Sequence, residues 1–299
     1  MKNLVPRVAA VHDLSCVGRC SLTVITPTLS ALGVQVCPLP TAVLSSHLGG
    51  FSGLEFYDFT GHMPAFFHHW KEEGLAFDSI YSGFLASEKQ IDVVLEFIDG
   101  FSQNNPLVLV DPVMGDHGKL YSTYTPTMQD RMKALVKKAD IITPNFTEAC
   151  FLLGENYQEL CSESGVMEDW LRRLTQMGPS IAVITGVPVA SDKIMNIGYD
   201  RNHQILWQAT HEYIPVRYPG TGDIYASVLL GSLLHGDSLS AAMQLAANFV
   251  GLAIETTFSA STPTREGVLL ERALPWLSRT FWQEKNIPYL STTTEKGGN

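Results

Sequence analysis

Leu107-Val-Leu-Val-Asp-Pro-Val-Met-Gly-Asp116 joins a short aliphatic run to a turn that carries two acids. The run Leu107–Val110 has an apolar side chain at every position, which is typical of a strand with both faces covered. Pro112 and Gly115 follow it as turn residues. We therefore expect a buried strand with Asp111 and Asp116 beyond its carboxyl end.

The same order of aliphatic run, turn and longer helix-like segment recurs along the chain. Further strands of this kind are predicted at Val8–Val11, Ser79–Ser82, Ile141–Thr143 and Ile181–Thr185. Helices are predicted between them at Ser21–Leu32, Pro64–Glu73, Glu88–Phe101, Thr127–Lys138 and Met167–Met177. This alternation predicts an α/β fold in which helices cover both faces of a mostly parallel sheet.

Two segments interrupt the alternation. Lys193–Asp200 and Gln204–His211 flank a short polar turn and predict an antiparallel hairpin. Val34–Leu44 contains two short β-like stretches interrupted by Pro38 and Pro40, so edge or lid strands are expected there. The chain is then predicted to finish in helices, at Asp223–His235, Ser240–Thr257 and Arg265–Ser278.

Length, charge and composition restrict the classes of function. Twenty Lys and Arg residues stand against thirty Asp and Glu residues in 299, a net charge of −10 that argues against nucleic acid and anionic membranes as partners. No apolar run approaches the roughly 18 residues of a membrane span. Five scattered cysteines favour a reducing, cytoplasmic compartment. We expect one domain over residues 1–290 and a disordered tail over 291–299.

Pro219-Gly-Thr-Gly-Asp223 stands directly before an apolar helix and is the strongest local signal of chemistry. Gly220 and Gly222 let consecutive backbone N–H groups point into one concavity at the positive end of the helix, which suits an anion. Asp223 could then accept a proton from a substrate hydroxyl beside a bound phosphoryl group. A glycine-rich turn with aspartate as N-cap would explain the same residues structurally.

Polar residues also follow the predicted strands. Asp111 and Asp116 lie at a strand end, where open α/β sheets bind ligands, and could hold a magnesium ion or its water shell. Acids that face solvent are the structural alternative. Thr143-Pro-Asn-Phe-Thr-Glu148 ends another strand, and Asn145 or Thr147 could cap the helix after it, with Glu148 in its first turn. A functional role for Glu148 requires it to lie near Asp116, where a shared cation would offset their repulsion.

Four motifs, in this order, resemble those of the ribokinase-like superfamily and, within it, the vitamin B6 (pyridoxal, pyridoxine and pyridoxamine) kinases. They are Asp111-Pro-Val-Met-Gly-Asp116, Ile142-Thr-Pro-Asn-Phe-Thr-Glu148, Val183-Ile-Thr185 and Pro219-Gly-Thr-Gly-Asp223. The resemblance extends from about Val8 to Leu277. It implies a three-layer α/β/α sandwich with a mostly parallel central sheet, a small β lid and a homodimer. It also implies ATP-dependent phosphorylation of the 5′-hydroxymethyl group of the B6 ring.

The resemblance implies roles for individual residues as well. Asp223 would be the base, and the amides of Gly220, Thr221 and Gly222 would stabilise charge on the transferring phosphoryl group. The Mg²⁺ that accompanies ATP would be held by three acids: Asp111, Asp116 and Glu148. The nucleotide, with a monovalent cation (K⁺ or Na⁺) beside it, would be contacted by residues at strand ends: Asp111, Thr143, Asn145, Glu148 and Thr185. The B6 vitamer would be contacted by Asp13, Ser46, His47, Phe84 and Asp223.

The acceptor side departs from the family pattern. Asp13 stands where many B6 kinases have serine in a Gln-Ser-His segment, Leu48 stands where a threonine follows the histidine, and Phe84 replaces a tyrosine near the pocket. An acid at position 13 could prefer a cationic group, such as the aminomethyl group of pyridoxamine, through a charge-assisted hydrogen bond.

Three other functions stay open. A hydroxymethylpyrimidine kinase of thiamine synthesis shares the fold and the Gly-x-Gly-Asp motif, and Asp13–Gly18 partly matches the segment that such enzymes carry after the first strand. A non-catalytic B6-binding protein would keep the pocket without turnover. A sugar kinase is compatible with the fold alone, although sugar-binding segments are not identifiable.

Overall fold

A nine-stranded sheet forms the centre of the computed structural model, which describes residues 5–121, 124–157 and 164–285. In spatial order its strands are β11 (Ile205–Glu212), β10 (Lys193–Asp200), β9 (Ile181–Ala190), β8 (Ile141–Ile142), β5 (Leu107–Val110), β4 (Ser79–Ser82), β1 (Arg7–Ser15), β2 (Gln35–Leu44) and β3 (Phe56–Asp58). Neighbours from β9 to β2 are parallel, whereas β10, β11 and β3 pair antiparallel at the two edges. A separate small hairpin pairs β6 (Gly115–Asp116) with β7 (Lys119–Leu120).

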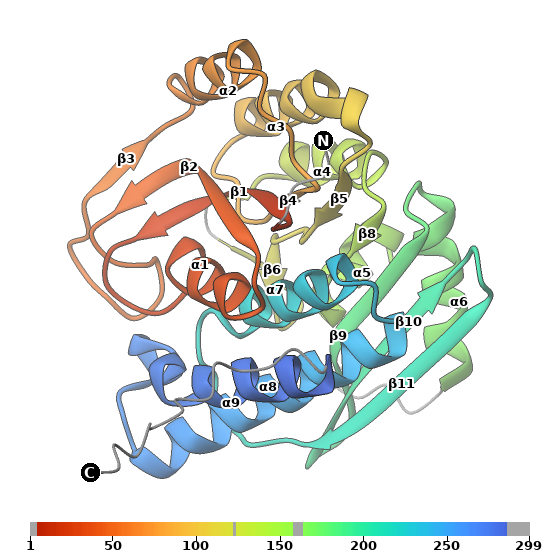
Figure 1. The fold of residues 1–299 in the computed structure, drawn as a ribbon. Coiled ribbons are helices and arrows are strands. Elements are labelled where there is room, and N and C mark those ends of the chain that lie inside the picture. The colour runs from red at the N-terminus through yellow and green to blue at the C-terminus, as the bar shows by residue number, and fades with distance from the viewer. Residues whose placement is uncertain (1–4, 122–123, 158–163, 286–299) are drawn as a thin grey trace, which may run out of the picture.

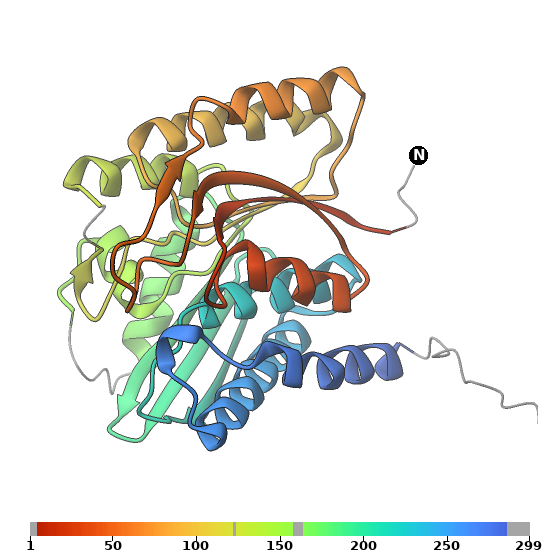
Figure 2. The same ribbon diagram turned by 90° about the vertical axis from the view of Figure 1, so that its left-hand side faces the viewer.

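Helices cover both faces of the sheet, as Figure 1 and the turned view in Figure 2 show. One face carries α2 (Met63–Glu72), α3 (Glu88–Phe101), α4 (Pro126–Val136), α5 (Phe146–Leu153) and α6 (Ser164–Gln176). The other carries α1 (Leu22–Ala31), α7 (Thr221–Leu234), α8 (Leu239–Ala260) and α9 (Leu270–Glu284). The predicted three-layer α/β/α architecture is therefore confirmed.

Strand β1 shows why the aliphatic runs predict this arrangement. Its side chains alternate between the faces of the sheet, so Ala9 and Val11 pack with one set of helices while Val8 and Ala10 pack with the other. All four are fully buried. A strand that contributes to two hydrophobic cores must be apolar at every position. An alternation of apolar and polar residues would instead have predicted a sheet with one face exposed to solvent.

The predicted elements are present with modest shifts at their ends, and two segments differ in form. Gln35–Leu44 is one continuous strand rather than two stretches. Pro38 and Pro40 do not interrupt it, because β3 pairs only with Ala42–Leu44. The outer edge of β2 is therefore unpaired at the two prolines and needs no N–H donor there. The last helix begins at Leu270 instead of Arg265. A 3₁₀ turn over Thr264–Glu266 and Gly267, at φ +76°, separate it from the preceding chain.

Within the described ranges, no helix is both long and apolar enough to cross a bilayer. The expected tail over residues 291–299 lies outside the described residues.

Candidate active site at the carboxyl edge of the sheet

The order of the strands reverses at β1, because the chain continues to β2 on one side of it and to β4 on the other. Ligands of open α/β sheets bind at the carboxyl ends of the strands beside such a reversal. The register of the parallel strands places four residues in one row across this edge: His12 within β1, and Gly83, Asp111 and Thr143 directly after β4, β5 and β8. The two strand-end residues predicted from sequence, Asp111 and Thr143, are thus brought together.

The loop before α7 approaches this edge of the sheet. Gly220 is the N-cap of α7 in a left-handed conformation, at φ +82°. A Cβ atom built on Gly220 would lie 2.2 Å from the carbonyl oxygen of Arg19, so no larger residue fits without moving the loop. A Cβ atom built on Gly222 would lie 3.9 Å from Asp111 Oδ2. The N-terminus of a helix, with its positive dipole end, therefore lies beside a row of acids.

Asp223, in the first turn of α7, points toward the end of β1. Its Oδ2 atom accepts a hydrogen bond of 2.8 Å from the backbone N–H of Ser21, and its Oδ1 atom lies 3.9 Å from His12 Nδ1. Burial raises the pKa of Asp223 to about 7, the charge of Asp13 adds to the rise, and the Ser21 N–H opposes it. Asp223 is thus a carboxyl group that gains and loses a proton near neutral pH.

Asp13 and Ser21 form a buried hydrogen-bonded pair beside Asp223, and the predicted site contains only Asp13 of the two. Asp13 accepts hydrogen bonds from the hydroxyls of Ser21, at 2.6 Å, and Ser15, at 2.8 Å. Burial raises the pKa of Asp13, while these hydroxyls and the nearby His47 lower it. Ser21 is absent from the predicted site. A serine at the start of a helix predicts an N-cap, and nothing in the sequence shows which acids fold onto it.

His12 is a further residue that the sequence did not identify as part of the site. Its ring is fully buried and packs edge-on against Tyr81, with centroids 4.3 Å apart. A Cβ atom on Gly83 would lie 2.2 Å from this ring, which explains the glycine after β4. Burial lowers the pKa of His12 to about 3, so the imidazole is neutral beside Asp223.

Asp111, directly after β5, and Glu148, in the first turn of α5, are buried near one another. Glu148 accepts hydrogen bonds from the backbone N–H groups of Met114, at 3.0 Å, and Asn145, at 2.8 Å. Burial nevertheless raises its pKa to about 8. Burial and the charge of Glu148, followed by that of Asp223, raise the pKa of Asp111 well above its usual range, while Thr143 opposes the rise. Among the residues that the structure describes, no basic side chain offsets the charge of these two carboxyls.

Asn145 connects this acidic site to the next strand. Of the two cap candidates, Asn145 and Thr147, the structure shows Asn145 as the cap of α5, in a full capping box with Glu148. The side-chain amide of Asn145 also donates to the carbonyl of Gly115. Its backbone forms a parallel bridge with Thr185, which lies on β9. Asp116, by contrast, is 47% exposed and pairs with His117. No group of three or more His, Cys, Asp and Glu side chains forms a metal cage in the described parts of the chain.

The loop after β2 supplies the predicted acceptor residues Ser46 and His47, both buried. His47 accepts a hydrogen bond from Gly49 N–H through Nδ1 and donates to the carbonyl of Arg265 through Nε2. These bonds orient the ring and join the loop to the turn before α9. Phe84 is half buried at the end of β4 and packs against the core on the α2–α6 face.

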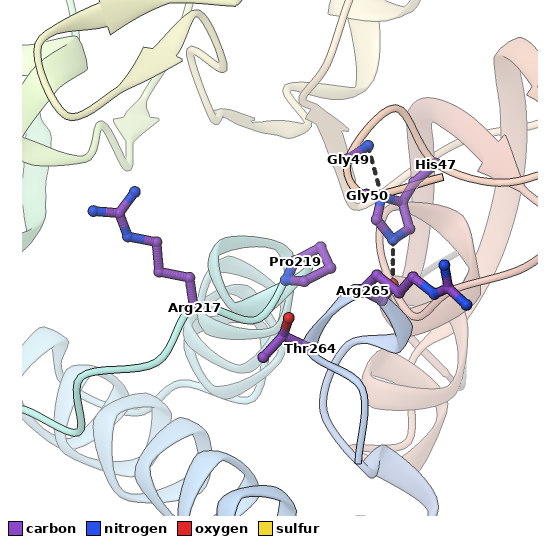
Figure 3. A pocket seen from close by; sticks show the side chains of 7 residues that line it. All are labelled: His47, Gly49, Gly50, Arg217, Pro219, Thr264 and Arg265. Carbon is purple, nitrogen blue, oxygen red and sulfur yellow. Dashed lines mark hydrogen bonds between the residues drawn. The ribbon is translucent and has the colours of Figure 1, made fainter. Parts of the chain in front are cut away.

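A shallow pocket of about 210 Å³ lies where this loop meets the chain before α7. Figure 3 shows its lining residues, with Arg217 and Arg265 at opposite ends and Pro219 and Thr264 between them. Arg217 also donates a 2.9 Å hydrogen bond to His117 Nδ1. The pocket is therefore positively charged and adjoins the glycine-rich turn at Pro219.

The buried carboxyls predict that stability falls with rising pH. Asp223 and Glu148 hold protons more tightly in the folded chain than in the unfolded chain, so unfolding releases protons between about pH 6.5 and 8.5. We expect the free energy of unfolding to fall by about 1–3 kcal/mol over this interval, since one pKa unit is worth about 1.4 kcal/mol. Below pH 6.5 the buried His12 acts in the opposite sense.

Urea titrations at half-unit pH steps, in the presence of a chelator, measure this dependence. The Asp223→Asn variant is the matched control, because it removes one of the two titrating groups and should flatten the curve. Stability that rises from pH 6.5 to 8.5 would contradict the expectation.

Known proteins share both the sequence and the fold. Residues 70–266 match the family model of phosphomethylpyrimidine kinase. The hydroxymethylpyrimidine/phosphomethylpyrimidine kinase of Bacillus subtilis is 31% identical over 62% of this chain and 66% of its own length. Pyridoxal kinase from Arabidopsis thaliana is 29% identical over 73% of this chain and 71% of its own length.

Solved structures cover almost the whole chain. A protein from Bacteroides thetaiotaomicron, assigned as a phosphomethylpyrimidine kinase, is 43% identical over 97% of both chains with a TM-score of 0.89. A second crystal form of that protein, crystallised with pyridoxal, has a TM-score of 0.87 over 96% of this chain and 97% of its own. Pyridoxal kinase from Lactobacillus plantarum is 30% identical over 94% of this chain and 99% of its own, with a TM-score of 0.83.

Proposed function

Since the chain belongs to the phosphomethylpyrimidine kinase family, whose enzymes transfer a phosphoryl group from ATP to an alcohol, we propose that it phosphorylates the 5′-hydroxymethyl group of a B6 vitamer. The acceptor would be pyridoxal, pyridoxine or pyridoxamine. The observation that carries this proposal is the relative from Bacteroides thetaiotaomicron, which matches 96% of the chain at 43% identity in a form with pyridoxal.

In the proposed reaction Asp223 is the base. Its Oδ2 atom is held by the Ser21 amide, which leaves Oδ1 to accept the proton of the acceptor hydroxyl. The hydroxyl oxygen forms a bond to the γ-phosphorus of ATP as the bond from that phosphorus to the β–γ bridging oxygen breaks, and ADP leaves with the electron pair. The backbone N–H groups of Gly220, Thr221 and Gly222 stabilise charge on the phosphoryl oxygens during transfer.

Asp111 and Glu148 would hold the Mg²⁺ that accompanies ATP, together with Asp116 through water. The two buried carboxyls with raised pKa values fit a divalent cation, because oxygen ligands suit Mg²⁺ and a positive charge would offset their burial. When bound, the ion would neutralise charge on the nucleotide phosphates. Thr143, Asn145 and Thr185 lie along the same edge and would contact the nucleotide phosphates or a monovalent cation, K⁺ or Na⁺.

The acceptor would lie between β1 and the loop after β2. Asp13, Ser46, His47 and Phe84 would surround the ring. His47 is bonded on both ring nitrogens, which supports a role in shaping this pocket. Asp13 and Asp223 both accept hydrogen bonds from Ser21, which supports a position of Asp13 beside the reacting hydroxyl.

We expect Asp13 to favour an acceptor with a cationic amine. Replacement of Asp13 by Ser or Asn removes the negative charge, so the ratio of kcat/KM for pyridoxamine over pyridoxal should fall by about tenfold, the effect of one charge-assisted hydrogen bond. Steady-state kinetics with both vitamers measures this ratio. Ser15→Ala is the control, since it removes a bond to Asp13 without removing the charge. An unchanged ratio in Asp13→Ser would show that the acid does not select the amine.

The test of the proposed function is ATP turnover with magnesium on pyridoxal, pyridoxine, pyridoxamine, hydroxymethylpyrimidine and its monophosphate. Turnover that depends on a B6 vitamer, and phosphate found on its 5′ oxygen, are the expected results. Binding of a vitamer without ATP consumption would indicate a non-catalytic binding protein instead.

A phosphomethylpyrimidine kinase is the second candidate. Its support is the family model over residues 70–266 together with the basic pocket at Arg217 and Arg265, which could receive an acceptor that already carries a phosphate. Turnover confined to the pyrimidine acceptors would favour it over the B6 kinase.

A further inference from the structure

Ser21 adopts a backbone conformation that residues with a side chain rarely adopt. Its φ of +50° and ψ of −136° lie outside the regions favoured by L-residues, although it is a serine and is buried. Backbone strain of this kind persists only where the surrounding structure enforces it, and it concentrates at functional sites. The conformation therefore requires an explanation from the contacts of Ser21.

The contacts of Ser21 are not those of an ordinary helix cap. A capping serine accepts a hydrogen bond from the backbone of the first helical turn, but the Ser21 hydroxyl makes no such bond with α1. It donates instead to Asp13 Oδ1, at 2.6 Å. Its backbone N–H donates to Asp223 Oδ2, at 2.8 Å. The strained conformation thus directs both donors of one residue at two acids that are 210 positions apart in sequence.

We infer that Ser21 is a positioning residue that fixes the base Asp223 and couples it to Asp13 in the acceptor pocket, an inference that rests on the proposed function. The hydroxyl bond to Asp13 anchors the residue, and the anchored N–H then fixes the rotation of the Asp223 carboxylate. Only Oδ1 is left to face the acceptor hydroxyl.

Ser15 provides an internal comparison. Its hydroxyl also donates to Asp13, on Oδ2 at 2.8 Å, and it is fully buried. It makes no hydrogen bond to Asp223 among the described residues. Both serines therefore hold Asp13 by a hydrogen bond, but of the two only Ser21 also bonds to Asp223.

The experiment compares Ser21→Ala, Ser21→Gly and Ser15→Ala, with B6 vitamer and ATP as substrates. Both Ser21 variants remove the anchoring hydroxyl, and glycine in addition accepts the positive φ without strain, so at least that variant should fold. We expect kcat to fall at least fivefold in both. Ser15→Ala should raise the acceptor KM while kcat stays within twofold of the wild-type value.

A double-mutant cycle tests the route of the effect. If the Ser21 hydroxyl acts through Asp13, then Ser21→Ala introduced into an Asp13→Ala background should lower kcat by less than twofold further. An equal fall of kcat in Ser15→Ala, additive effects in the cycle, or a Ser21→Ala variant with wild-type kcat would each overturn the inference. Wild-type protein without turnover on any B6 acceptor would overturn the proposed function itself, which is a separate and recognisable result.

Discussion

Asp223→Asn is expected to lower kcat by about 10²–10⁴-fold, the usual contribution of a general base. Asparagine has the same shape, and its carbonyl oxygen can still accept the Ser21 N–H. It cannot take a proton from the acceptor hydroxyl. The fold and the binding of nucleotide should therefore survive while transfer stops.

Coupled ATP turnover and single-turnover transfer to the vitamer measure this loss. Asp237→Asn is the matched control, because Asp237 lies beyond the other end of α7 and bonds to Ser232 and Lys285. That variant should keep the wild-type kcat. An Asp223→Asn enzyme with more than a tenth of wild-type kcat would contradict the assignment of the base.

The same carboxyl predicts how activity depends on pH. Asp223 must be deprotonated to accept a proton, and burial raises its pKa to about 7. Activity should accordingly fall as pH decreases below about 7, whereas an exposed aspartate would stay active to about pH 4. The fall in activity and the gain in stability on acidification then have one origin, the protonation of buried acids.

The sheet could be predicted from the sequence because the apolar composition of its strands reflects their burial on both faces. Leu107–Val110 and Val8–Val11 are packed by helices on both faces, so the aliphatic runs specify the position of the strands and the parallel sheet together. The row of Asp111 and Thr143 follows from the same reasoning, since the carboxyl ends of parallel strands share one edge.

The acceptor side was less predictable because its contacts join distant segments. Ser21 and Asp223 are bonded across 202 positions, and His47 and Arg265 across 218. No local pattern encodes such pairs. Glu148 illustrates the other difficulty, because the capping box and the buried acidic site use the same carboxylate. Its structural and functional explanations are both compatible with one sequence motif.

Gly220→Ala is expected to lower kcat by about 10²–10³-fold, which is the usual cost of losing one backbone donor from an anion hole. The new Cβ atom would lie 2.2 Å from the carbonyl oxygen of Arg19, which is backbone and cannot turn aside. The loop must shift, and the N–H groups at residues 220–222 would then no longer point at the transferring phosphoryl group.

Gly236→Ala is the control that separates the effect of displacing the loop before α7 from the effect of backbone strain in a left-handed alanine. Gly236 follows α7 with φ +87°, close to the +82° of Gly220, but a Cβ atom there would have no neighbour within 4 Å. Both variants carry the strain of a left-handed alanine, about 1 kcal/mol or slightly more. Urea unfolding should show that loss in both, with the larger loss in Gly220→Ala. Only Gly220→Ala should lose kcat, and equal kcat values in the two variants would mean that the turn before α7 does not hold the phosphoryl group.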